Sequence, residues 1–102
     1  METRTPLLVI DRDTRPATYQ TLLRYAVRQA ESRKPGVAFD VVSIVPGEGS
    51  PSEQVKAAQS ASLDAGAVAR EIVDAGVSDG QVHLGARADP DASHGQVRVY
   101  VR

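Results

Sequence analysis

The stretch Ser50–Gly76 constrains the fold most strongly, because it carries the start and stop signals of one long helix. Its first four residues, Ser-Pro-Ser-Glu, match a capping box with proline at the first helical position. In such a box Ser50 accepts a hydrogen bond from the N–H of Glu53, whose side chain accepts one from the N–H of Ser50. At the other end we expect Gly76 to take the left-handed conformation that follows a helix. The apolar pair of this Schellman stop would be Ile72 and Val77.

One face of this helix carries mostly small apolar side chains, spaced three and four residues apart. A helix with such a face can approach a sheet closely, so we expect it to pack flat against one. The residues predicted to face the sheet are Val55, Ala58, Ser62, Ala65, Val68, Ala69, Ile72 and Val73.

Five further segments show the pattern of a strand or a helix. Residues 7–10 form a short continuous apolar run, typical of a strand buried on both faces. Residues 17–33 repeat apolar side chains at helical spacing, and residues 37–45 alternate as a strand does. Residues 81–87 and 96–102 alternate apolar and polar side chains around a polar connection, which predicts an antiparallel hairpin.

The order of these elements predicts the fold class. A strand–helix–strand unit of this length predicts a right-handed crossover and a parallel pair of strands. We therefore expect an α+β fold, a two-layer sandwich with the order βαβαββ, in which two helices cover one face of a four-stranded mixed sheet. A chain of 102 residues is the size of one domain, so the domain is residues 1–102.

Charge and composition exclude several classes of function. The net charge of -1 gives no electrostatic basis for binding nucleic acid or an anionic membrane. The lack of cysteine excludes disulfides, thiol catalysis and cysteine-ligated metals. No apolar run approaches the roughly 20 residues of a membrane span, and no signal peptide is visible. We expect no membrane insertion, and either a cytoplasmic protein or the C-terminal part of a longer chain.

Four segments, in this order and spacing, share the pattern of a known family. They are Leu7-Leu8-Val9-Ile10-Asp11 followed by Pro16, then Phe39–Val45, Ala69–Val77 and Gln96–Val101. Together they span nearly the whole chain and resemble the OmpA-like domain, the periplasmic module at the C-terminus of OmpA, Pal and MotB-type proteins. The resemblance implies a non-catalytic binding or structural module of the cell envelope, located in the periplasm and without a cofactor.

The ligand-binding residues of that family are not matched at the corresponding positions. The family holds the diaminopimelate carboxylate of peptidoglycan with an aspartate after the second strand and an arginine in the long helix. Those positions fall here at about Pro46 and near Asp64, and the closing Arg-Arg of the family falls near Gly95-Gln96. Asp64 would repel a carboxylate that an arginine binds bidentately. The resemblance thus implies a degenerate clamp, with a protein or a cell-wall component as the partner.

The candidate ligand-binding residues combine these positions with nearby charges. Glu48 lies in a Gly-Glu-Gly-Ser run before a helix N-terminus, a place where anions can bind. Pro51 removes one donor there, and Glu48 and Glu53 add negative charge. If the family's clamp has moved, arginines elsewhere would replace it. The candidates are Pro46, Glu48, Asp64, Arg70 and Arg98.

Metal binding has weak candidates around the last connection. Oxygen-bearing side chains alternate in Asp89–Gly95 as they do in calcium loops, but the glycine and glutamate of an EF-hand are not at the required positions. His83 and His94 flank the same connection and, with Asp89 or Asp91, could hold zinc. A solvated loop with two surface histidines is the simpler interpretation, and we expect no bound metal.

Catalysis has one candidate, the loop after the first strand. Asp11 and Asp13 follow a predicted strand end, where ligand sites of α/β proteins lie, and paired carboxylates can serve acid–base chemistry. Arg12 and Arg15 lie beside them, so a solvated mixed-charge loop is the simpler interpretation. No Ser-His-Asp order, phosphate-binding loop or zinc-protease motif is present. We expect a binding module, with a cytoplasmic regulatory or ligand-binding domain as the alternative and an enzyme third.

Overall fold

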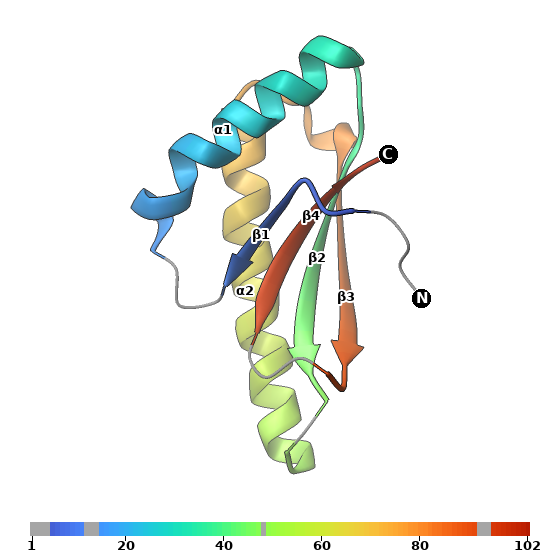
Figure 1. Ribbon diagram of the computed structural model, residues 1–102. Helices are drawn as coiled ribbons and strands as arrows, with labels where there is room; N and C mark the ends of the chain where they lie inside the picture. Colours follow the sequence, from blue (N-terminus) through green and yellow to red (C-terminus); the bar gives the residue numbers. More distant parts are fainter. Residues whose placement is uncertain (1–4, 12–14, 48, 92–94) are drawn as a thin grey trace.

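A single four-stranded sheet carries two helices on one of its faces (Figure 1). The computed structural model describes residues 5–11, 15–47, 49–91 and 95–102. A short 3-10 turn, Asp79–Gln81, precedes the third strand. The predicted two-layer α+β fold with the order βαβαββ is confirmed. The elements are β1 (Leu8–Asp11), α1 (Pro16–Arg33), β2 (Phe39–Pro46), α2 (Pro51–Asp74), β3 (Val82–Asp89) and β4 (Gln96–Val101).

The strands lie in the order β1-β4-β2-β3 across the sheet. β4 is antiparallel to both of its neighbours, whereas β2 and β3 are parallel. β1 and β2 therefore run in the same direction, as the strand–helix–strand pattern predicts, but β4 separates them. The predicted hairpin of residues 81–87 and 96–102 is wrong, because these two strands lie on opposite sides of β2.

The central position of β4 explains why the hairpin does not form. β4 buries Val97 and Val99 on the helix side of the sheet and Tyr100 on the other side, with 2%, 0% and 1% of their surfaces exposed. Burial on both faces is easiest where a strand has a neighbour on each side. Alternation in the sequence predicts which face of a strand is buried, but it does not predict which strands are neighbours.

β1 is the opposite case, a strand predicted to be buried on both faces that lies at an edge. The apolar run at residues 7–10 predicts burial on both faces, but Ile10 is the one buried residue of β1. Val9, whose side chain lies on the other face, is 44% exposed. The prediction is wrong because the helices cover one face only and, among the described residues, no strand lies beyond β1 in the sheet.

Both ends of α2 follow the signals in the sequence. The Ser50 hydroxyl accepts from the N–H of Glu53 at 3.3 Å, and Pro51 is the first helical residue. The second half of the capping box differs, because the Glu53 carboxylate accepts from the Ser50 hydroxyl, at 3.1 Å, in place of the backbone N–H. Gly76 has a φ of 110°, and its N–H donates to the C=O of Val73 at 2.9 Å, as in a Schellman stop.

The predicted face of α2 is confirmed in its C-terminal half and shifted in its N-terminal half. Ala65, Val68 and Ile72 are buried as expected, and Ala61 is buried in addition. The first turns of α2 extend past the strands (Figure 1), since 24 helical residues span about 36 Å and eight strand residues about 27 Å. The periodic pattern continues there without a surface to pack against. The residues predicted to be buried but found exposed are Val55, Ala58 and Ser62.

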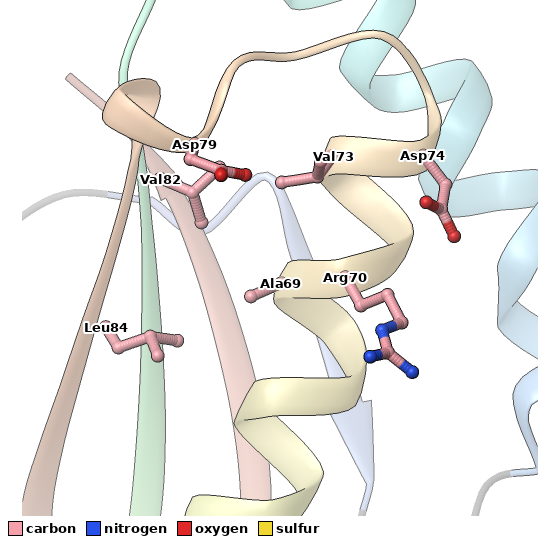
Figure 2. Close-up of a pocket in the computed structure, with 7 residues that line it drawn as sticks. All are labelled: Ala69, Arg70, Val73, Asp74, Asp79, Val82 and Leu84. Atoms are coloured by element: carbon pink, nitrogen blue, oxygen red, sulfur yellow. The ribbon is translucent and has the colours of Figure 1, made fainter.

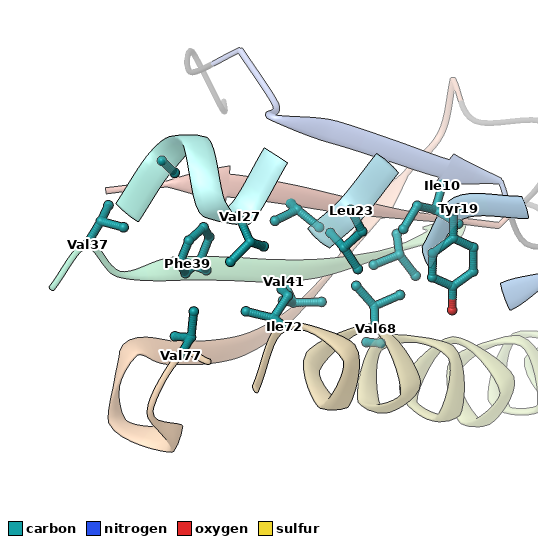
Figure 3. Packing of buried hydrophobic residues seen from close by; sticks show 14 residues of the cluster. Ile10, Tyr19, Leu23, Val27, Val37, Phe39, Val41, Val68, Ile72 and Val77 are labelled. Atoms are coloured by element: carbon teal, nitrogen blue, oxygen red, sulfur yellow. The ribbon is translucent and has the colours of Figure 1, made fainter. Parts of the chain in front are cut away.

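Small side chains let α2 approach the sheet closely, as the sequence predicts. The hydroxyl of Ser43 on β2, which is 2% exposed, donates to the backbone C=O of Ala61 at 2.9 Å. This bond satisfies a buried polar group and fixes the helix over β2. Between the layers lies one apolar core, drawn from α1, α2, β1, β2 and β4 and from the segments beside them (Figure 3). β3 contributes Val82 at the border of this core.

Candidate functional site

The predicted ligand-binding residues lie on different surfaces. Pro46 at the end of β2 and Arg98 of the neighbouring strand β4 both lie on the face of the sheet that carries no helix. Asp64 and Arg70 belong to α2, which lies on the other face. Glu48 is outside the described residues. The structure therefore does not bring these residues into one site, and their role in ligand binding stays a prediction.

Asp64 is part of the contact between the two helices. Tyr19 of α1 is buried against α2, and this burial raises the pKa of its hydroxyl; the negative charges of Glu71 and Asp64 raise that pKa further. Glu71 also accepts hydrogen bonds from Gln20 at 2.9 Å and from Arg24 at 3.3 Å. The carboxylates on this side of α2 thus help to hold α1 in place.

The weak metal candidates are separated or already engaged. Asp89 lies 3.7 Å from the guanidinium of Arg98, and its other oxygen accepts from the N–H of Asp91 at 2.9 Å. His83 is exposed on β3, and His94 is outside the described residues. Within the described ranges, no three His, Asp or Glu side chains lie close enough to share a metal ion.

The loop after β1 is described in part. Asp11 accepts from the side-chain amide of Gln96 at 3.2 Å, across the β1–β4 pair. Arg15 precedes α1, whereas Arg12 and Asp13 are outside the described residues. Asp11, the described acidic residue at this end of β1, thus forms a hydrogen bond with the neighbouring strand β4.

The feature that sequence analysis missed is the outer edge of β3. β3 is the last strand of the sheet, and its residues pair with β2 in continuous register from Val82 opposite Phe39 to Asp89 opposite Pro46. This eight-residue strand contains neither a proline nor a bulge, the features that commonly block pairing at an edge. Its outward N–H and C=O groups form a template on which another strand can pair.

An open groove of about 370 Å³ runs beside this edge, between β3 and α2. Val82 and Leu84 form the strand side of the groove, and Ala69 and Val73 project toward them from the helix (Figure 2). Leu84 is 61% exposed, although it lies on the face of the sheet that the helices cover. Its exposure arises because α2 leaves the outer side of β3 uncovered and no described strand lies beyond β3.

Charged residues also line this groove. Arg70 and Asp74 of α2 point away from β3, whereas the carboxylate of Asp79 points from beside Val82 toward Val73 at one end (Figure 2). Away from that end, where Ala69 lies across from Leu84, the groove is apolar and suited to apolar side chains. A strand that paired with the outer edge of β3 would place every second side chain in this groove.

Two other grooves lie beside α1. One, of about 470 Å³, is bordered by Leu22 and Tyr25, which are 54% and 62% exposed. The other, of about 520 Å³, lies between α1 and α2 next to the Gln20–Glu71 hydrogen bond. Neither combines an apolar floor with a long unpaired strand, which leaves the β3 edge as the candidate site.

Comparisons with known proteins assign no family. No family model matches the sequence, and no curated protein matches it. Among solved structures, the chain is similar to 2C-methyl-D-erythritol 2,4-cyclodiphosphate synthase from Plasmodium vivax, with a TM-score of 0.42 and 18% sequence identity over 78% of this chain. The chain spans 51% of the length of that protein. A similarity at this level assigns neither a fold family nor an activity.

We expect no membrane insertion, and the described helices can be compared with that expectation. Neither α1 nor α2 combines the length and the apolar character that crossing a bilayer requires.

Proposed function

We propose that this protein is a non-catalytic interaction module that binds an extended segment of another polypeptide along the outer edge of β3. The observation that carries the proposal is an eight-residue strand edge that no other described strand pairs with, bordered by a groove that is apolar beside Leu84. Binding by strand addition uses this combination, because backbone hydrogen bonds supply affinity and side-chain pockets supply specificity.

Leu84 is the side chain on which this binding depends most. Burying its exposed surface would contribute about 1–2 kcal/mol, a fraction of the about 1.5–3 kcal/mol of a fully buried leucine. Each net backbone hydrogen bond to β3 would add about 0.5–1.5 kcal/mol. The cost of ordering a flexible segment offsets part of this gain. Loss of the Leu84 contact should therefore weaken binding roughly 5- to 30-fold.

Selection of short random peptides from a displayed library tests the proposal. The wild-type protein serves as bait, and the Leu84→Lys variant serves for counter-selection, since a lysine at that position places a charge in the groove. Leu63→Lys is a matched control, because Leu63 is 76% exposed on α2 and lines the groove toward α1. We expect selected peptides with alternating apolar residues that bind wild type and Leu63→Lys equally and lose binding to Leu84→Lys.

Two results would contradict this function. Selected peptides that bind Leu84→Lys as tightly as wild type would place their site elsewhere. Peptides without apolar alternation would argue against an added strand, because period-two spacing is the signature of a strand that has one side in a groove.

The OmpA-like resemblance supports the same class of function, a binding module, and adds a periplasmic setting with a cell-wall component or a protein as the partner. What supports it is the order of elements across the chain. A pulldown on purified peptidoglycan sacculi tests it, with wild type beside the Pro46→Asp and Asp64→Arg double variant. Binding gained by the double variant alone would support a family fold with a degenerate clamp. Binding by neither would leave the family's ligand without relevance here.

A further inference from the structure

We infer that the segment bound at β3 carries acidic side chains at every second position, with apolar side chains between them. This inference rests on the proposed function and specifies the partner by its chemistry. An added strand would share two faces with β3, one turned toward α2 and one turned to the open side of the sheet. Each face selects a different kind of side chain.

The face toward α2 selects apolar side chains. Alternate residues of β3 on this face are all apolar, and the nearest helix residues are Ala69 and Val73. Side chains of an added strand on this face would lie between Leu84 and α2, away from water. The β3 residues on this face are Val82, Leu84, Ala86 and Ala88.

The open face of β3 selects negative charge. It carries His83, Gly85, Arg87 and Asp89, and Asp89 already faces the guanidinium of Arg98 at 3.7 Å. Within the described part of the chain, the side chains of His83 and Arg87 make no hydrogen bond or ion pair. At Gly85 a Cβ atom would meet nothing within 4 Å, so the space between these two side chains is open.

Pairing between side chains on neighbouring strands makes the open face of β3 favour a partner strand with negative charge. Opposite charges directly across two strands stabilise the pair, and like charges destabilise it. A carboxylate opposite or diagonal to Arg87 would gain a charge-assisted hydrogen bond that the domain itself does not provide.

A second copy of this chain fits the edge less well. In two-fold antiparallel pairing, directly opposed residues share a face, so the open faces of both β3 strands join. With Gly85 on the axis, Arg87 of each copy faces His83 of the other, and with Arg87 on the axis two arginines face each other. With Ala86 on the axis, Asp89 of each copy faces His83 of the other, but Arg87 faces Gly85 and gains no acidic partner. In none of the registers that pair most of the strand does Asp89 lie opposite Arg87. The charge pattern therefore favours a different polypeptide with acidic side chains.

Two synthetic peptides test the inference. Both carry alternating valines; one has glutamate and the other lysine at the positions between. Fluorescence anisotropy gives their Kd values for wild type, for Arg87→Glu and for Arg28→Glu, a matched control at an exposed arginine of α1. We expect the glutamate peptide to bind wild type roughly two- to tenfold more tightly than the lysine peptide. Arg87→Glu should reverse the preference, and Arg28→Glu should keep it.

The possible outcomes separate this inference from the function on which it rests. Equal binding of the two peptides, or a preference that survives Arg87→Glu, overturns the inference, while Leu84→Lys still tests strand addition. If neither peptide binds, the inference is wrong, and the library selection decides whether strand addition is wrong too. A wild-type dimer in sedimentation that Leu84→Lys abolishes would assign the edge to a second copy and also overturn the inference.

Discussion

The two edges of the sheet differ in the features that control strand pairing. β1 has four residues and β3 has eight. Ile10 of β1 is 5% exposed and lies beside Tyr19 of α1 (Figure 3), whereas Leu84 of β3 is 61% exposed. Both side chains are aliphatic, and both point to the helix side of their edge strand. The difference comes from the helices, because α1 lies over the β1 side and α2 leaves the outer side of β3 uncovered (Figures 1 and 2).

Under the proposed function, this difference separates stability from binding within one sheet. A short, covered edge contributes its apolar residue to the core, so the domain needs it in order to fold. A long, uncovered edge pairs with the sheet on its inner side, and its outward groups remain available for another strand. The following predictions test whether the two edges are in fact divided in this way.

The largest expected effect is on stability. Ile10→Ala should lower the free energy of unfolding by about 2–5 kcal/mol, as the truncation of a buried isoleucine does. Leu84→Ala, the matched truncation at the other edge, should cost less than about 0.5 kcal/mol, as changes at exposed sites do. Urea denaturation of the two variants beside wild type measures both values. Similar losses in the two variants would mean that the edges are not divided between folding and binding.

The second effect is on amide hydrogen exchange. Residues 96–99 of β4 lie between β1 and β2, whereas alternate amides of β3 point away from β2 and have no partner in a described strand. We expect alternate β3 amides to exchange at least about tenfold faster than β4 amides, a difference of about 1.4 kcal/mol in protection. Exchange followed residue by residue in NMR spectra measures this. Uniform slow exchange along β3 would show that its edge is covered in solution.

Periodicity in the sequence predicts the elements and their faces, and it does so for a local reason. Side-chain period depends on backbone geometry within one element, so Leu84 and Val99 are each assigned to the helix side without knowledge of the rest of the fold. Strand neighbours depend on contacts between distant segments. The hairpin prediction therefore failed, although the faces of both strands were right. The prediction of which α2 residues face the sheet failed in the N-terminal half of the helix for a related reason, because periodicity cannot show where the sheet ends.

The candidate site escaped sequence analysis because its residues are ordinary apolar ones. Ala69 and Val73 carry the pattern of a buried helix face, and Leu84 that of a buried strand face. They border an open groove only because β3 is the outermost strand. The resemblance to the OmpA-like family directed attention to Asp64 instead, which lies at the helix–helix contact. The signal that could have pointed to the site is β3 itself, eight alternating residues without a proline. It becomes informative only when the strand is known to lie at the edge of the sheet.

The smallest expected effect concerns the cover of the β1 edge at high pH. Burial raises the pKa of the Tyr19 hydroxyl, and the charges of Glu71 and Asp64 raise it further. The unfolded chain therefore loses this proton at a lower pH, about 10, than the folded protein does. Between the two pKa values the folded state binds more protons, so the stability that Tyr19 contributes is complete below about pH 10 and is lost as pH rises through the folded pKa.

Tyr19→Phe keeps the aromatic cover over Ile10 and removes the ionisable group. The unfolding free energy of wild type relative to this variant should be constant at neutral pH and should decline above about pH 10. Tyr25→Phe is the matched control, because Tyr25 is 62% exposed on the same helix. Urea denaturation at a series of alkaline pH values measures the differences. If wild type and Tyr19→Phe lose stability in parallel, folding does not keep the Tyr19 hydroxyl protonated. Tyr19 would then not be buried over Ile10, and the β1 edge would not be covered in the way that distinguishes it from β3.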